Sequence, residues 1–126
     1  MTYSRELLIG QWYRTDTDKQ GSLLTEYATI SADGSYEFSF IEHDSDGKVT
    51  EQIIELGDWG LVGDIHFTIA KSEFINEQHM AADLANPDNY HAYNVLRLDH
   101  KIFEYQHVIS QEIFLLTRVT DNMAFC

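Results

Sequence analysis

Hydrophobic and polar residues alternate along most of this chain. In the segment SYEFSFIEH, Tyr36, Phe38 and Phe40 fall on one face, and the residues between them are polar. Alternation of this kind is typical of a β-strand with one buried face and one face in water. The pairs Asp33-Gly34 and Asp46-Gly47 precede and follow this segment, and Asp-Gly favours the tight turns of β-hairpins. The pattern therefore predicts consecutive antiparallel strands.

The same pattern over the whole chain predicts about eight strands. They cover residues 10–16, 22–31, 35–43, 48–57, 59–70 (with a break at Gly63-Asp64), 89–99, 102–110 and 112–119. Short connections between them predict an all-β, antiparallel up-and-down meander, either closed into a barrel or partly open. A short helical turn is expected within YSRELLIG. A short helix is possible near 76–86, where Met80 and Leu84 are four residues apart.

The alternation also assigns side chains to the interior of the predicted barrel. In DIHFTIAK it places Phe67 inward and His66 outward. In YHAYNVLRLD the positions of Leu96 and Leu98 turn Asn94 inward and Tyr93 outward. A candidate ligand site then consists of eight inward-facing aromatic or polar side chains: Tyr36, Phe38, Phe40, Phe67, Asn94, Tyr105, His107 and Phe114.

Length and charge narrow the class of protein. The 126 residues suit one domain, 1–126. The net charge is −13, with eight basic residues against 21 acidic ones, and such a field repels nucleic acids and anionic membrane surfaces. Neither a signal peptide nor an apolar stretch of about 20 residues is found, so we expect a cytoplasmic protein. The single cysteine, Cys126, excludes an internal disulfide.

Four motifs occur in a characteristic order along the chain: LLIGQW near the start, then SADGSYEFSF, LGDWGLVGDIHFTI and finally FLLTRV. In this order they resemble the small bacterial lipocalin-like domains of the calycin group. The resemblance implies a structural closure pair, in which Arg118 of the last strand packs across the Trp12 ring at the closed end. An arginine on an apolar face needs a partner, and an indole ring offers a cation–π contact. The alternative is that Arg118 marks a strand end and extends to water.

The leading functional hypothesis is a binding module for a small apolar or amphipathic ligand in the barrel. The alternative is a structural or interaction protein that acts as a homodimer without a ligand. An enzyme using His107 with Tyr105 or Asn94 is a third hypothesis, although His107 is also consistent with an ordinary core histidine. We expect no cofactor and no metal site, because the histidines lack metal-ligand spacing and Asp44-x-Asp46-Gly47 matches a hairpin turn.

Overall fold

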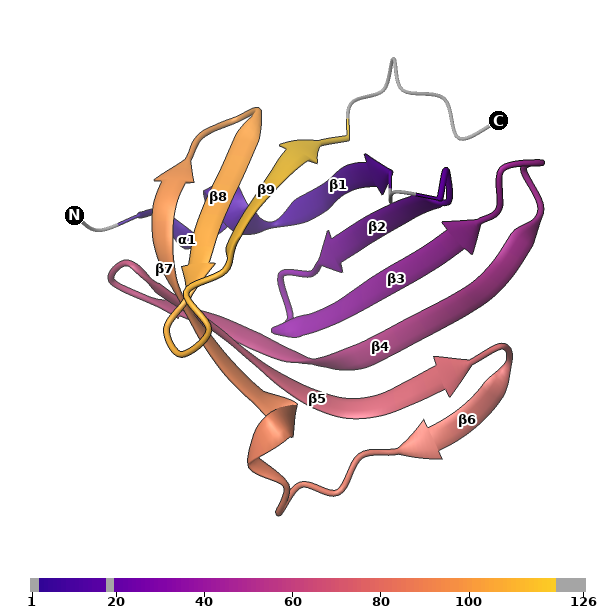
Figure 1. The fold of residues 1–126 in the computed structure, drawn as a ribbon. Helices are drawn as coiled ribbons and strands as arrows, with labels where there is room; N and C mark the ends of the chain where they lie inside the picture. Colours follow the sequence, from indigo (N-terminus) through magenta and orange to yellow (C-terminus); the bar gives the residue numbers. More distant parts are fainter. Residues whose placement is uncertain (1–2, 18–19, 120–126) are drawn as a thin grey trace.

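The computed structural model describes residues 3–17 and 20–119, which form a barrel of antiparallel strands (Figure 1). Cys126 lies outside the described residues. The chain begins with the helical turn α1 (Arg5–Leu8), and a 3-10 turn, η1 (Pro87–Asn89), precedes β7. The strands are β1 (Gly10–Thr17), β2 (Leu23–Ile30), β3 (Ser35–His43), β4 (Val49–Val62), β5 (Ile65–Ile75), β6 (Gln78–Ala81), β7 (Tyr90–Leu98), β8 (Ile102–His107) and β9 (Ile113–Arg118).

Eight of the nine strands in the described residues close into a ring. The order is β4-β3-β2-β1-β9-β8-β7-β5, and β4 also pairs with β5, which completes the circle. The strand β6 stands outside this ring and pairs with residues 72–75 of β5, as Figure 1 shows at the lower edge of the molecule. The prediction of an all-β antiparallel barrel is confirmed, and the closed form is the one observed.

The segment 76–86 is not helical, so this part of the prediction is wrong. Asn76 and Glu77 have φ angles of 49° and 75°, and they form a tight turn between β5 and β6. Asparagine tolerates this left-handed conformation better than most residues. The apolar pair that suggested a helix does not form a buried face, since Met80 is 50% exposed and Leu84 is 49% exposed.

The strand β4 also differs from its prediction, because it continues without a break through Gly57 and Asp58. Gly57 lies opposite Tyr36 of β3, and a Cβ atom at Gly57 would lie 2.8 Å from the Tyr36 hydroxyl oxygen. This glycine therefore permits a close approach within a strand and does not mark a turn. The turn occurs at Gly63-Asp64, where a break was predicted.

The prediction that Phe67 faces the interior is wrong. In this part of β5, His66 and Thr68 face inward, with exposed fractions of 2% and 1%. Phe67 is on the outer face, where it lies opposite Gly60 of β4 and covers the backbone there. Apolar residues occupy the outer face of this strand while a histidine and a threonine face inward. Hydrophobicity alone consequently gives the reverse assignment.

The prediction that Asn94 faces inward is also wrong, and the cause is a β-bulge. The register between β7 and β8 shifts between Val95 and Arg97, so the strand does not keep one alternation along its length. Val95 and Leu98 are both buried, although they are three residues apart. Tyr93 thus faces inward with Val95, opposite His66 of β5, and Asn94 points outward.

Buried apolar side chains fill the closed end of the barrel. Trp12 and Phe103 are buried, and their ring centroids are 5.7 Å apart. The Trp12 indole N–H donates a hydrogen bond of 2.9 Å to the carbonyl oxygen of Leu8, at the end of α1. The helical turn is thereby attached to β1 and covers this end.

Arg118 completes this end from the last strand. Its guanidinium carbon lies 4.2 Å from the centroid of the Trp12 ring. The guanidinium also donates to the carbonyl oxygens of Ile9 (3.0 Å) and His100 (2.9 Å), and to that of Leu7. One side chain therefore joins β9 to the chain before β1 and to the loop before β8. The structure places Arg118 across Trp12 and not in the position of a free strand-end cation.

Candidate functional site

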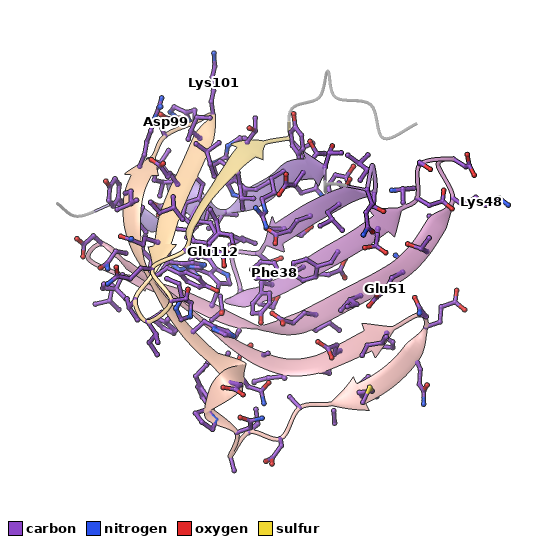
Figure 2. All side chains as sticks on the ribbon, in the orientation of Figure 1. Phe38, Lys48, Glu51, Asp99, Lys101 and Glu112 are labelled. Carbon is purple, nitrogen blue, oxygen red and sulfur yellow. The ribbon has the colours of Figure 1, made fainter. Side chains whose placement is uncertain are left out.

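The register of β1 to β5 arranges the inner wall of the barrel in rows of side chains. Of the three rows nearest the mouth, the innermost contains Trp12, Ala28, Phe38, Glu55 and Glu73. The next row contains Arg14, Glu26, Phe40, Ile53 and Ile75. The row at the mouth contains Asp16, Leu24, Glu42 and Glu51. The wall is thus aromatic toward the closed end and acidic toward the mouth, and Figure 2 shows Phe38 and Glu51 on its inner face.

An open cavity of about 210 Å³ lies at this mouth, within the outer two rows. Its apolar lining includes Leu24, Phe40, Ile41 and Ile53. Its charged lining, among the described residues, consists of one basic and four acidic side chains: Arg14, Asp16, Glu26, Glu42 and Glu51. The cavity therefore combines an apolar wall with a strong excess of negative charge.

Glu26 is the least solvated of these carboxylates. Its side chain is 12% exposed, and its nearest cation is Arg14, whose Nε atom is 3.7 Å from Glu26 Oε2. Burial raises the pKa of Glu26, the Arg14 charge lowers it, and the charges of Glu55 and Glu112 raise it further. The Arg14 guanidinium also lies over the Phe114 ring, at 5.1 Å. The charge of Glu26 is thus incompletely balanced within the protein.

Tyr36 and Glu55 form the polar floor beneath the cavity. The Tyr36 hydroxyl donates a hydrogen bond of 2.7 Å to Glu55 Oε2, and the Tyr36 ring lies 4.3 Å from that of Phe38. Burial raises the pKa of the Tyr36 hydroxyl, and the neighbouring Glu55 charge raises it further. Tyr36 is therefore a neutral donor at physiological pH, and Glu55 is the acceptor.

The half of the barrel below this floor is packed with aromatic side chains around His66. The His66 ring lies 5.5 Å from Phe103 and 5.7 Å from Tyr93, and its Nδ1 atom is 3.3 Å from the Gly60 carbonyl oxygen. Burial lowers the pKa of His66 to about 4. His66 is accordingly a neutral core residue at pH 7. Burial also raises the pKa of Tyr93 to about 12.

His107 faces inward, as predicted, but both of its ring nitrogens have partners. Nδ1 accepts hydrogen bonds from the backbone N–H groups of Ile109 (3.1 Å) and Ser110 (3.2 Å). Nε2 lies 3.1 Å from Nδ1 of His91. These bonds order the loop between β8 and β9, so the structure gives His107 a role in that loop.

The residues predicted from the sequence are thus distributed over several places. Phe40 lines the cavity, and Tyr36 and Phe38 lie just below it. Tyr105 and Phe114 stack at 5.3 Å in the packed interior. Phe67 and Asn94, by contrast, are on the outer surface.

Of the ten described residues that line the cavity, the sequence predicted Phe40 alone. The nine others are Arg14, Asp16, Leu24, Thr25, Glu26, Ile41, Glu42, Glu51 and Ile53. The alternation in LLTEYATI could have placed Glu26 inside the barrel, because Glu26 shares a face with Ala28 and Ile30.

Among residues 3–17 and 20–119, no group of three or more histidine, cysteine or acidic side chains is arranged to hold a metal ion. Within the same residues, no helix has the length and apolar character needed to span a membrane.

The fold is similar to that of a known protein. The crystal structure of a lipocalin-like protein from Bacteroides uniformis superimposes with a TM-score of 0.54 and 17% sequence identity, over 90% of this chain and 99% of that chain. No family model and no curated protein matches the sequence. The lipocalin-like fold that the four sequence motifs predicted is therefore confirmed. At this level of identity the similarity concerns the fold alone.

Proposed function

We propose that this lipocalin-like barrel binds a small amphipathic ligand at its mouth. The observation that carries the proposal is the open cavity of about 210 Å³, where Leu24, Phe40 and Ile53 form an apolar wall beside charged side chains. Ligand sites are typically concave and apolar with a few polar groups, and the mouths of β-barrels are common places for them. Such sites usually have volumes of roughly 300–1,000 Å³, so we expect a small ligand that extends partly into solvent.

Binding of a neutral environment-sensitive dye, Nile red, tests this proposal. We expect saturable fluorescence enhancement with the wild-type protein. Ile53→Trp fills the cavity from its wall and should weaken dye binding at least about tenfold, a change of about 1.4 kcal/mol. Ile54→Trp is the matched control, since Ile54 is the next residue of β4 and faces the outer side, opposite Phe74. Equal dye binding by wild type and Ile53→Trp would contradict the proposal.

The alternative function is that of an interaction protein that acts as a homodimer, and the strand β6 favours it. Its four residues are exposed, and among the described strands it pairs with β5 alone. Its other edge thus leaves backbone groups available to a second chain, although so short an edge limits such pairing. Sedimentation equilibrium tests this alternative, because a strict monomer at every concentration would contradict it.

A further inference from the structure

We infer that the ligand of the mouth cavity is an organic cation, an amine that carries a small apolar group, and that Glu26 binds its ammonium. The inference rests on the proposed function, because it names the chemical class of ligand for the same cavity. Its basis is the charge and the arrangement of the side chains around that cavity.

The lining of the cavity has a strong excess of negative charge. Arg14 is the only basic residue among the described residues of the lining, against Asp16, Glu26, Glu42 and Glu51. The lining therefore has a net charge of −3 when all five side chains are ionised. An anionic ligand would meet repulsion inside a partly desolvated site, where charge interactions are stronger than in water. A cation would instead neutralise part of this charge.

The charge of Glu26 is incompletely compensated within the protein. This carboxylate has little access to water, with a side-chain exposure of 12%, and its contact with Arg14 is 3.7 Å long. A carboxylate in this environment gains more from a direct partner than a solvated carboxylate does. A ligand ammonium that enters the cavity supplies that partner. A neutral ligand of the same size does not.

Aromatic rings lie next to Glu26 on the inner wall. Glu26 lies directly opposite Phe40 in the antiparallel pair β2–β3, and Phe40 lies opposite Ile53 in the pair β3–β4. The Phe38 ring is 6.3 Å from the Phe40 ring and perpendicular to it. An ammonium beside Glu26 therefore also lies near aromatic faces, which attract cations. The apolar part of the same ligand would contact Phe40 and Ile53.

Competition between three probes of equal chain length tests the inference. Octylammonium, 1-octanol and octanoate are each used to displace Nile red at pH 7, where an alkylamine is protonated. We expect octylammonium to displace the dye at a concentration at least about tenfold lower than 1-octanol, with octanoate the weakest. Glu26→Gln should remove most of the preference for octylammonium over 1-octanol and leave the affinity for 1-octanol unchanged. A small preference should persist, because Asp16, Glu42 and Glu51 still outweigh Arg14 in the lining.

Glu37→Gln is the matched control for the change of charge. Glu37 is an exposed residue of β3, opposite Thr29, and it faces away from the cavity. This variant should keep the full preference for octylammonium. If Glu37→Gln removes the preference as Glu26→Gln does, overall charge and not the cavity selects the cation, and the inference is wrong.

The outcomes separate this inference from the function on which it rests. If the dye does not bind, or no probe displaces it, the proposed function itself fails. If the dye binds and 1-octanol or octanoate displaces it as well as octylammonium does, the cavity binds ligands but does not select cations. In that case only the inference is overturned.

Discussion

The Arg118 guanidinium lies 4.2 Å from the centroid of the Trp12 ring and connects the last strand of the barrel to the first. The two residues are also direct neighbours across the β1–β9 pairing. Three backbone carbonyl groups around the ring accept hydrogen bonds from the same guanidinium. The charge is thus held by an aromatic face and by carbonyl dipoles, without a carboxylate partner among these contacts.

The first prediction concerns the energy of this contact. Trp12→Ala and Arg118→Ala should each lower the free energy of unfolding, and a double-mutant cycle should give a coupling of about 0.5 kcal/mol or more. Arg118→Lys should recover little of the loss, because an ammonium cannot reproduce the planar set of donors. Urea denaturation of the wild type and the four variants measures these free energies. Strictly additive losses would show that the contact contributes nothing.

Gly10 lies beside Arg118 at the same closed end of the barrel, where a larger residue should destabilise the fold. Its φ angle is 137°, and a Cβ atom there would collide with Nη1 of Arg118. Gly10→Ala should therefore destabilise the protein by more than about 1 kcal/mol. The loss should be smaller in an Arg118→Ala background, where only the backbone strain remains. An equal loss in both backgrounds would exclude the collision as a cause.

His66 should make stability depend on pH. Its pKa is about 4 in the folded barrel, against 6.5 in the unfolded chain. Between these values the unfolded state binds the proton and the folded state does not, so stability falls as the pH falls from about 6.5 to about 4. The loss from this group should total roughly 3 kcal/mol. Urea denaturation at several pH values should show a shallower dependence for His66→Gln, and an unchanged dependence would contradict this assignment.

Glu26 should have the opposite effect on stability. Burial raises its pKa in the folded state, so its contribution is most favourable at low pH and declines as the pH rises through the folded pKa. At pH 7 the charged form destabilises the fold, and Glu26→Gln should raise the thermal midpoint. Glu37→Gln, on the outer surface, should change it less. A lower midpoint for Glu26→Gln would show that its pairing with Arg14 outweighs the cost of burial.

The hydrogen bonds of His107 fix its tautomer. Because Nδ1 accepts two backbone N–H groups, the proton of the neutral ring must be on Nε2, which donates to Nδ1 of His91. Long-range nitrogen–proton NMR spectra should show the Nε2–H tautomer for both rings near pH 7.5. A Nδ1–H signal for His107 would contradict the loop geometry.

Local sequence was sufficient to predict most strands, since their alternation and turn residues agree. The strand at 35–43 has the predicted bounds, and Tyr36, Phe38 and Phe40 face inward because no bulge interrupts their phase. The Trp12–Arg118 contact was expected from the resemblance to lipocalin-like domains, and the need of an arginine on an apolar face for a partner supports it.

The cavity was less predictable, because its residues break the rule that links hydrophobicity to burial. Glu26 and His66 face inward although they are polar, and Phe67 faces outward although it is apolar. The bulge near Val95 reverses the phase of β7 through a backbone irregularity that no residue type marks. Which side chains face the barrel interior depends on which strands become neighbours. Local sequence patterns do not contain that information.

The seam between β1 and β9 also has a kinetic consequence. It contains the residue pairs Trp12–Arg118 and Tyr13–Thr117, and the bond from Arg118 to Ile9 spans 109 positions of the chain. Contacts of such span form late, because ordering the intervening chain costs entropy before the contact offsets it. Arg118 contacts that are absent from the folding transition state slow unfolding and leave the folding rate unchanged. We therefore expect the lifetime of the closed barrel to depend on this one side chain.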